Sequence, residues 1–366
     1  MRTFGVEEEL LLVDERSGVP RAIAPAILRK AGEAPIRGFA LEAEMQQEMI
    51  EVISRPCTER VDLLHCMCDG RRTADEFARE QGGRAIALAA SPLSVRPHVT
   101  VKERYKAIED GYAGMARATL ECGFHVHTGI DSPDEGVAVL DRIRVWLPLF
   151  LALSANSAFR EGEDTGYASF RFVVWHHWPT AGPNDVFGSV EAYRALERAL
   201  VDTGAILDTG MLYFDARLSH RHDTVETRIA DVCLTAEDGA TLACLIRALV
   251  DHAADEWRRG VPPPDVPTPV IRLASWQAAR HGVTDRLVDP TTGRPCTARD
   301  VIARMIDTVR PELRRNGDED FVERGVADIL RRGTGSDRLR AVHQETGSID
   351  AVIAAAAAAT IGESRG

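Results

Sequence analysis

Lysine is scarce in this sequence. The 366 residues include 44 lysines and arginines together, and only Lys30, Lys102 and Lys106 are lysines. The G-x-x-x-x-G-K-[ST] loop that cradles nucleotide phosphates is absent, which excludes a P-loop enzyme. Beyond residue 106, any phosphate group must therefore be bound by arginine, by a metal ion or by backbone N–H groups.

A C-x-x-C pair is also absent. The chain has seven cysteines, an odd number, at spacings that favour neither a disulfide framework nor a zinc knuckle. No Ser-His-Asp or Cys-His signature of a protein nucleophile is evident. We therefore expect a reducing, cytoplasmic environment and a chemistry without a covalent protein intermediate.

Long apolar runs and an excess of positive charge are missing as well. The longest apolar candidate, AVIAAAAAATIG at 351–362, is shorter than the roughly 20 residues that a membrane span needs. The N-terminus has no basic segment before an apolar stretch, so we expect no signal peptide. The formal net charge of −12 argues against nucleic acid or an anionic membrane as a partner.

The patterning predicts an α+β fold. Apolar periodicity predicts strands at 3–14, 48–54, 84–93, 123–130, 211–219 and 223–232, and helices at 58–82, 134–156, 189–204 and 236–260, the second kinked or divided at Pro148. These elements do not alternate regularly, which favours a mixed or antiparallel sheet. We expect one domain, 1–366, with a Pro-rich connector at 261–269 and a helical part at 270–366 that packs against the sheet.

The first predicted strand begins with three adjacent carboxylates, Glu7, Glu8 and Glu9. Strand alternation places Glu7 and Glu9 on one face and Glu8 on the other. Because a buried carboxylate is costly unless it is paired or bound to a metal, Glu7 and Glu9 favour a cation between them. A solvent-exposed edge strand would explain them equally well.

Three further segments contain similar groups. The segment 41–54 holds four glutamates among apolar residues, which an exposed acidic helix face would also explain. His125 and His127 share one face of a predicted strand, as do Glu226 and Arg228. Taken together, the carboxylates outnumber the imidazoles, and hard oxygen ligands suit Mg²⁺ or Mn²⁺ better than zinc. Such a metal beside an arginine is typical of a site for ATP phosphates.

These segments together resemble the carboxylate–amine ligases of the glutamate–cysteine ligase type 2 family, which are relatives of glutamine synthetase. The resemblance is carried, in the family's order, by GVEEELLLVD, EMQQEMIEVIS, GFHVHTGI, ANSAFREGEDTGYASFRF and DTVETRIADV between residues 5 and 232, and by WQAARHG at 276–282. It implies a glutamine synthetase/guanido kinase-like fold. In that fold a curved, mainly antiparallel sheet carries helices on its convex side, and its concave face binds ATP and two or three divalent metals.

The resemblance also implies roles for individual residues. The expected metal ligands are Glu7, Glu9, Glu44, Glu51, His125 and Glu226. Because Glu44 and Glu51 are seven residues apart, a turn or bulge near Gln46 is needed to bring them to one face. His127 is expected to face the transferred phosphate or the substrate carboxylate. Arg228 is expected to contact the phosphate of ATP during catalysis.

One segment departs from the family's pattern. The chain has SAFR where family members commonly have Pro-Phe-Trp, so Ala158 and Arg160 are expected to alter the pocket and leave the acceptor open. The expected substrate-binding residues are Arg171, Tyr167 and Asn156, from the same segment. A buried structural role would explain Arg171 equally well.

We therefore predict an ATP-dependent ligase that uses Mg²⁺ or Mn²⁺ and joins a carboxylate to an amine through an acyl phosphate. Glutamate and cysteine are the default substrates by resemblance, and a homodimer or larger homo-oligomer is expected on the same ground. Two alternatives stay open. A metal-dependent amidohydrolase also uses H-x-H on a strand, although normally on its first strand, and a non-catalytic binding protein could share the fold.

Overall fold

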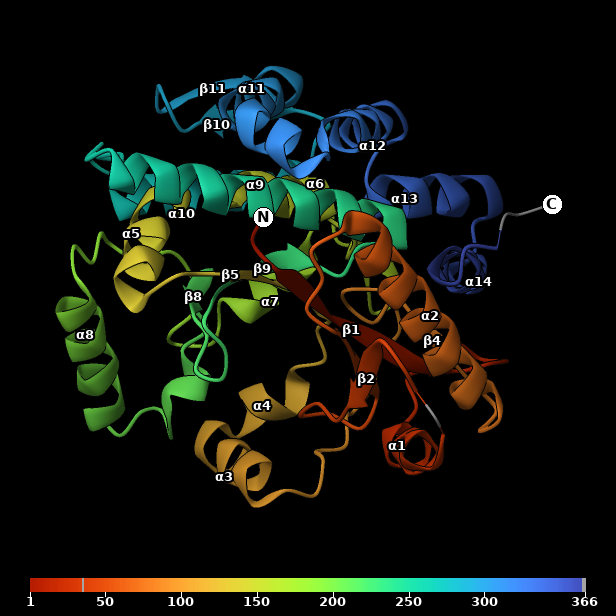
Figure 1. Cartoon of the computed structure of the whole chain (residues 1–366). Helices are drawn as coiled ribbons and strands as arrows, with labels where there is room; N and C mark the ends of the chain where they lie inside the picture. Colours follow the sequence, from red (N-terminus) through yellow and green to blue (C-terminus); the bar gives the residue numbers. More distant parts are fainter. Residues whose placement is uncertain (35, 364–366) are drawn as a thin grey trace.

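The structure is a computed structural model that describes residues 1–34 and 36–363. Its centre is a seven-stranded sheet with the order β2-β3-β1-β5-β9-β8, and β4 also pairs with β1 (Figure 1). The strands are β1 (Phe4–Asp14), β2 (Phe39–Glu42), β3 (Met49–Ser54), β4 (Gly83–Ile86), β5 (Gly123–Gly129), β8 (Ala216–Leu218) and β9 (Thr224–Asp231). All of these strands pair antiparallel, which confirms the predicted α+β class and its mainly antiparallel sheet.

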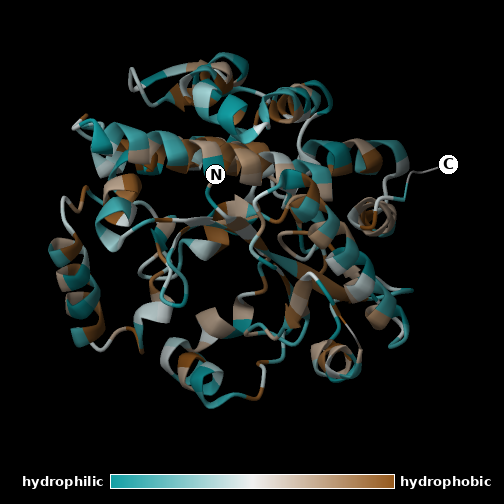
Figure 2. Ribbon diagram, in the orientation of Figure 1, coloured by the Kyte–Doolittle hydropathy of each residue, from teal (hydrophilic) through white to brown (hydrophobic). Residues whose placement is uncertain are grey.

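Helices cover one face of this sheet. Those that contact its strands there are α2 (Arg60–Arg79), α5 (Pro133–Ile143), α6 (Leu147–Ser154) and α9 (Ala236–Arg258). Figure 2 shows hydrophobic residues along the middle of α9, where it passes over the sheet, and hydrophilic residues toward its C-terminal end. The helix therefore shields the strands along its apolar middle.

The remaining elements lie around this core or beyond the other face of the sheet. They are α1 (Ala24–Glu33), α3 (Glu103–Tyr112), α4 (Gly114–Ala118), β6 (Phe159–Arg160), β7 (Glu163–Asp164), α7 (Phe170–Trp175), α8 (Val190–Asp202) and the 3₁₀ helix η1 (Thr209–Met211). In Figure 1, α3 and α4 lie on the side of the sheet away from α9.

Three predicted elements differ in extent from the expectation. The helical stretch at 134–156 is divided, because Pro148 lies in the first turn of α6, where its missing N–H is tolerated. The strand predicted at 211–219 is real only over Ala216–Leu218, since Met211 ends η1. The strand predicted at 84–93 ends at Ile86.

The C-terminal part packs mainly on helices rather than directly on the sheet. It comprises α10 (Thr268–His281), β10 (Arg286–Asp289), β11 (Arg294–Thr297), α11 (Ala298–Asn316), α12 (Glu319–Arg332), α13 (Gly335–Thr346) and α14 (Ile349–Thr360). Helices α11 and α12 contact α9, so α9 lies between them and the sheet, whereas α14 contacts β4 (Figure 1). The hairpin β10–β11 was not expected, because 270–366 was predicted to be helical.

The Pro-rich connector is fixed to the rest of the chain. Arg144 donates hydrogen bonds to the carbonyl oxygen of Val266 at 2.8 Å and to the hydroxyl of Thr268 at 2.7 Å. The end of α14 is fixed as well, since the backbone N–H of Ala87 donates to the hydroxyl of Thr360 at 2.8 Å.

In the part of the chain that the structure describes, no helix has the length and apolar character needed to cross a membrane.

Strand alternation divides the charges of β1 between the two faces of the sheet. Glu8 points toward the helices, where it is fully buried and paired with Arg71 of α2. The Arg71 Nε donates to Glu8 at 3.1 Å, and the same guanidinium donates to the carbonyl oxygens of Cys233 and Leu234. The face assignment of Glu8 is thus confirmed, but β1 is a central strand rather than an exposed edge.

This buried ion pair generates a stability prediction. Arg71→Met is expected to lower the free energy of unfolding by about 3–5 kcal/mol, because it leaves the Glu8 carboxylate buried without its partner. The matched control is Arg72→Met, since Arg72 is the next residue of α2, is 56% exposed and pairs with exposed Asp69. That change should cost less than about 1 kcal/mol. Chemical denaturation followed by circular dichroism measures both, and equal losses would contradict the assignment.

Candidate functional site

A cavity of about 690 Å³ opens on the face of the sheet opposite α2 and α9. The strands β1, β3, β5 and β9 form its floor, and α3 and the segments around 43–46 and 208–222 form its walls. All six expected metal ligands line it, together with His127 and Arg228. The cavity is therefore the place where the sequence-predicted site residues meet.

The antiparallel register brings these side chains into neighbouring positions. The cross-strand partners are Glu9 with Glu51, Glu7 with His125, and His127 with Glu226. Side chains directly opposite one another on a sheet face lie close together. Glu44 joins them from the turn between β2 and β3, and this turn confirms the predicted change of direction near Gln46.

Three groups of side chains could each hold a metal ion. Within each group the ligand atoms lie within 4.8 Å of one another; the groups are Glu7–His127–Glu226, Glu7–Glu51–His125 and Glu9–Glu44–Glu51. All six expected ligands are included. The first group also includes His127, whose expected role of facing a phosphate or a substrate carboxylate stays a prediction.

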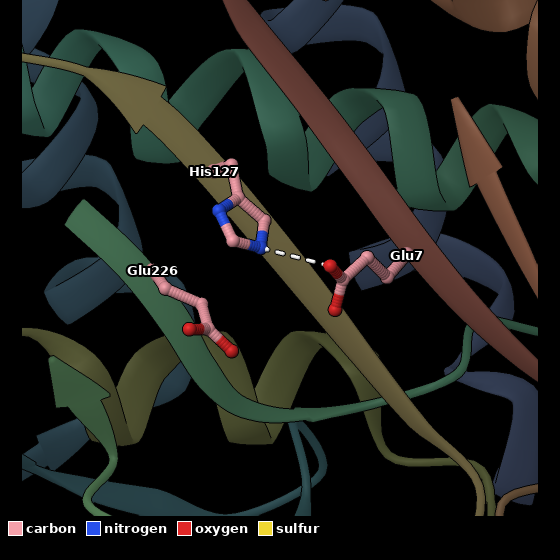
Figure 3. A group of neighbouring side chains, drawn as sticks. All are labelled: Glu7, His127 and Glu226. Carbon is pink, nitrogen blue, oxygen red and sulfur yellow. Dashed lines mark ion pairs between the residues drawn. The ribbon is translucent and has the colours of Figure 1, made fainter. Parts of the chain in front are cut away.

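The Glu7 carboxylate is held by two imidazoles. It lies 3.0 Å from the Nδ1 of His125 and 3.2 Å from the Nε2 of His127, and Figure 3 shows the second contact. Burial alone would raise the pKa of Glu7, but the hydrogen bond from His125 and the close contact with His127 hold this pKa well below its usual range. The Nδ1 of His127 contacts the Thr224 hydroxyl at 2.9 Å, which orients the ring.

The Glu226 carboxylate is held by two arginines. Arg217 of β8 donates to it at 2.9 Å through Nε, and Arg228 donates through Nη1. Burial would raise the pKa of Glu226, but the charges of Arg228 and Arg217 hold it well below its usual range. Because these arginines already offset its charge, a metal is not needed to explain why Glu226 is buried.

The third group gives the strongest indication of a metal. Glu9, Glu44 and Glu51 converge without a histidine or arginine among them. Loss of hydration and the nearby Glu9 carboxylate raise the pKa of Glu44 to about 7, and burial and then Glu44 raise that of Glu51 well above its usual value. Like charges this close cannot all be ionised without a cation. The carboxylate-rich donor set therefore fits Mg²⁺ or Mn²⁺.

The structure does not bring the expected substrate-binding residues to the cavity. Asn156 is fully buried and donates to the carbonyl oxygens of Ala87 and Val232, each at 2.8 Å. Tyr167 packs against Trp276 of the WQAARHG segment with ring centroids 6.4 Å apart. Asn156 and Tyr167 therefore connect parts of the fold, and their placement gives no support to a substrate-binding role.

Arg171 does not line the cavity either. It is 2% exposed, its Nη1 donates to the Ile229 carbonyl at 3.2 Å, and it lies 3.7 Å from Asp231. This geometry supports the buried structural role that the sequence left open. Ala158 and Arg160 do not line the cavity either, so the SAFR departure does not change its wall directly.

Several cavity residues were not found from the sequence. Arg217 lies on a segment predicted as a strand. Nothing in that segment indicated that Arg217 would lie opposite Glu226 on the neighbouring strand. Glu121 precedes the predicted strand at 123–130 with the same parity as His125 and His127, and this alternation could have placed it on the cavity face. Trp175, Trp178 and Tyr213 form an aromatic wall with ring centroids 5.0–6.3 Å apart, which only long-range packing brings together.

Comparison with known families gives a match along nearly the whole chain. Residues 3–355 match the model of the family described as Glutamate-cysteine ligase family 2 (GCS2). A relative from Paenarthrobacter aurescens named "Putative glutamate--cysteine ligase 2-1" is 49% identical, over 98% of this chain and 95% of its own length. One from Streptomyces coelicolor, named "Putative glutamate--cysteine ligase 2", is 43% identical over 97% and 98%.

Comparison with solved structures shows the same fold at low sequence identity. Glutamate–cysteine ligase from Francisella tularensis, solved in complex with AMP, aligns with a TM-score of 0.69 and 11% identity, over 98% of this chain and 88% of that one. A bifunctional glutathione synthetase from Pasteurella multocida aligns with a TM-score of 0.67 and 15% identity, over 99% and 51%.

The carboxylate group generates a metal-binding prediction. Glu51→Gln is expected to weaken Mn²⁺ binding at least about tenfold, since changes around metal ligands alone typically cost about 10–100-fold. The matched control is Glu42→Gln, because Glu42 lines the same cavity opposite Glu51 but belongs to none of the three groups. Titration calorimetry with Mn²⁺ measures both affinities, and an equal loss in both variants would exclude the assignment.

Metal affinity is also expected to rise with pH between about 6 and 8, because bound protons compete with the metal. The raised pKa values of Glu44 and Glu51 mean that the metal-free site carries protons below pH 7 or so, and Mn²⁺ must displace them. As the pH rises through the pKa of Glu44, its carboxyl group ionises and the competition weakens. Calorimetry in buffers of different ionisation enthalpy measures the protons released, and a pH-independent affinity would contradict this sign.

Proposed function

The chain belongs to glutamate–cysteine ligase family 2, and from this premise we propose that it is an ATP-dependent carboxylate–amine ligase. In this reaction a substrate carboxylate attacks the γ-phosphorus of ATP, giving an acyl phosphate and ADP. An amine then attacks the acyl carbon, the C–N bond forms and phosphate leaves. The observation that carries the proposal is the group Glu9, Glu44 and Glu51 in one cavity with Arg217 and Arg228.

The proposed metal ligands are the six glutamates and histidines predicted from the sequence, with His127 added. A divalent metal, when bound, would offset the charge of the ATP phosphates. The chain's own contribution is to hold its ligands in place before the metal arrives: Glu9 accepts a hydrogen bond from the backbone N–H of Gly123, and Glu7 is oriented by His125. The donor set and the convergence of the carboxylates support this assignment.

Arg228 is the proposed catalytic arginine. Burial would lower its pKa, but Glu226 and Glu7 raise it, so the guanidinium stays charged inside the cavity. A fixed positive charge in a partly dehydrated site stabilises a phosphoryl group as it transfers, without any reorganisation of water. Arg217, on the neighbouring strand, shares Glu226 with Arg228 and keeps it in position.

No protein nucleophile is required by this scheme. Among the residues that the structure describes, the cavity lining contains no cysteine. Cys66, Cys233 and Cys244 lie in the core, and burial raises the pKa of the Cys244 thiol above its usual range. The proposed covalent intermediate therefore forms on the substrate and not on the chain.

The substrates, the oligomeric state and the cellular location are proposed from the family alone. The relatives' names favour glutamate as the acid and cysteine as the amine, and the AMP in the Francisella tularensis complex favours a nucleotide in the corresponding cavity. We also propose a single catalytic unit, which the contacts of α11, α12 and α14 with the core support. A homo-oligomer and a cytoplasmic location stay predictions.

The proposed intermediate can be intercepted. With ATP, Mg²⁺ and a panel of amino acids and other small carboxylates, hydroxylamine is expected to give a hydroxamate with equal amounts of ADP and phosphate. Arg228→Ala should lower this rate by about 10²–10³, because it removes a fixed positive charge from the cavity. Arg228→Lys should lower it similarly, because the lysine keeps the charge but loses the planar fork of the guanidinium group. ATP affinity should fall much less. Hydroxamate colorimetry and calorimetry with ATP measure the two effects.

The control variant is Arg194→Lys on α8, which does not line the cavity and should keep the wild-type rate. Formation of AMP and pyrophosphate would replace the acyl phosphate by an adenylate. Turnover of an amide in the absence of ATP would instead indicate a metal-dependent hydrolase.

A further inference from the structure

A polar recess adjoins the carboxylate group in the wall of the cavity. It is formed by Gln46, Thr119 and Glu121, none of which has a part in the scheme above. Glu121 lies two residues before Gly123, whose backbone N–H donates to Glu9. The recess is therefore beside the proposed phosphoryl-transfer site, and Gln46 and Glu121 are 2% and 5% exposed.

Two buried oxygens of this recess have no hydrogen-bond donor. The Nε2 of Gln46 donates to the carbonyl oxygens of Ala116 at 2.9 Å and Thr119 at 3.1 Å, which fixes the orientation of the amide. Within the described chain, its Oε1 and the Oε2 of Glu121 accept no hydrogen bond. Leaving a buried acceptor unpaired costs about 1–3 kcal/mol, and native proteins rarely leave two such groups together without a reason.

We propose that this recess binds the ammonium group of the amine substrate, with Glu121 as its charged partner and Gln46 as a second acceptor. The inference rests on the proposed ligase function and names the part of the cavity that recognises the amine. An ammonium group offers several N–H donors and a positive charge, which the Gln46 Oε1 and the Glu121 carboxylate complement. A phosphate or carboxylate group is disfavoured, because the Nε2 of Gln46 already donates to two backbone carbonyl oxygens and neither side chain carries a positive charge.

The raised pKa of Glu121 agrees with a site that is neutral when empty and binds a cation. Burial raises the pKa of Glu121 to about 8, against the opposing charges of Arg160 and Arg171. Neither arginine donates a hydrogen bond to it among the described residues. The neutral form explains how the carboxyl group remains buried without a ligand, and an ammonium ion beside it favours the ionised form. Glu121→Gln should therefore fold, since the amide has the same shape and no charge.

The test compares a charged with an uncharged nucleophile. Ammonium chloride supplies the charged amine, and hydroxylamine, which is largely uncharged near neutral pH, supplies the other. The acid is the one that gives the highest hydroxamate rate in the panel described above. In Glu121→Gln, we expect the KM for ammonium to rise at least about tenfold, the loss typical of one charged hydrogen bond. Hydroxamate formation should lose much less, because hydroxylamine carries no positive charge for Glu121 to pair with.

The matched control is Asp215→Asn. Asp215 is also a buried acid with one unpartnered oxygen and a pKa that burial raises to about 7, but it lies outside this cavity. Asp215→Asn should leave the KM for ammonium unchanged. Should Glu121→Gln misfold by circular dichroism, Glu121→Asp tests the same expectation, because the shorter side chain withdraws the charge from the recess.

The outcomes separate this inference from the function on which it rests. An unchanged KM for ammonium in Glu121→Gln, or an equal loss with hydroxylamine, would overturn the recess as the ammonium site while leaving the ligase intact. Absence of any ATP-dependent product from the wild-type protein with every acid would overturn the ligase proposal, and this inference would fall with it.

Discussion

The two-residue alternation of β1, at the centre of the sheet, is the constraint on which the site depends. It sends Glu7 and Glu9 into the cavity and Glu8 into the helix layer, where Arg71 holds it. A shift of one residue in the pairing would reverse these faces and bury two carboxylates among apolar helices. The Glu8–Arg71 pair thus favours the same register that aligns Glu9 with Glu51 and Glu7 with His125.

The carboxylates of the cavity differ in how their negative charges are offset. Histidines offset Glu7, and two arginines offset Glu226, so both carboxylates are ionised without help from a ligand. Among the described residues, Glu44 and Glu51 form no such ion pair, and burial, followed by repulsion from neighbouring carboxylates, raises their pKa values. The difference between paired and unpaired acids indicates where a divalent cation would contribute most, and the proposed ammonium site at Glu121 follows the same reasoning.

The outer helices support this floor through their packing. Helix α9 is covered by the sheet on one side and by α11 and α12 on the other, so the apolar middle of a 23-residue helix is buried all round. The segment 155–172 and the WQAARHG helix pack on one another through Tyr167, Trp276 and Arg280. Segments that carry the family resemblance therefore serve the scaffold as well as the cavity.

The sequence by itself determined the strand alternation and the α+β class, because two-residue periodicity and residue type are local properties. The six ligands were expected from the family resemblance, and the structure places all six along one cavity. The division at Pro148 was equally local. Only the tertiary structure decided that Arg217 meets Glu226, that Glu121 and Gln46 line the same cavity, and that Asn156, Tyr167 and Arg171 do not line it. These outcomes depend on which strands become neighbours and in which register, and contacts between residues far apart in the chain leave no periodic trace in either segment.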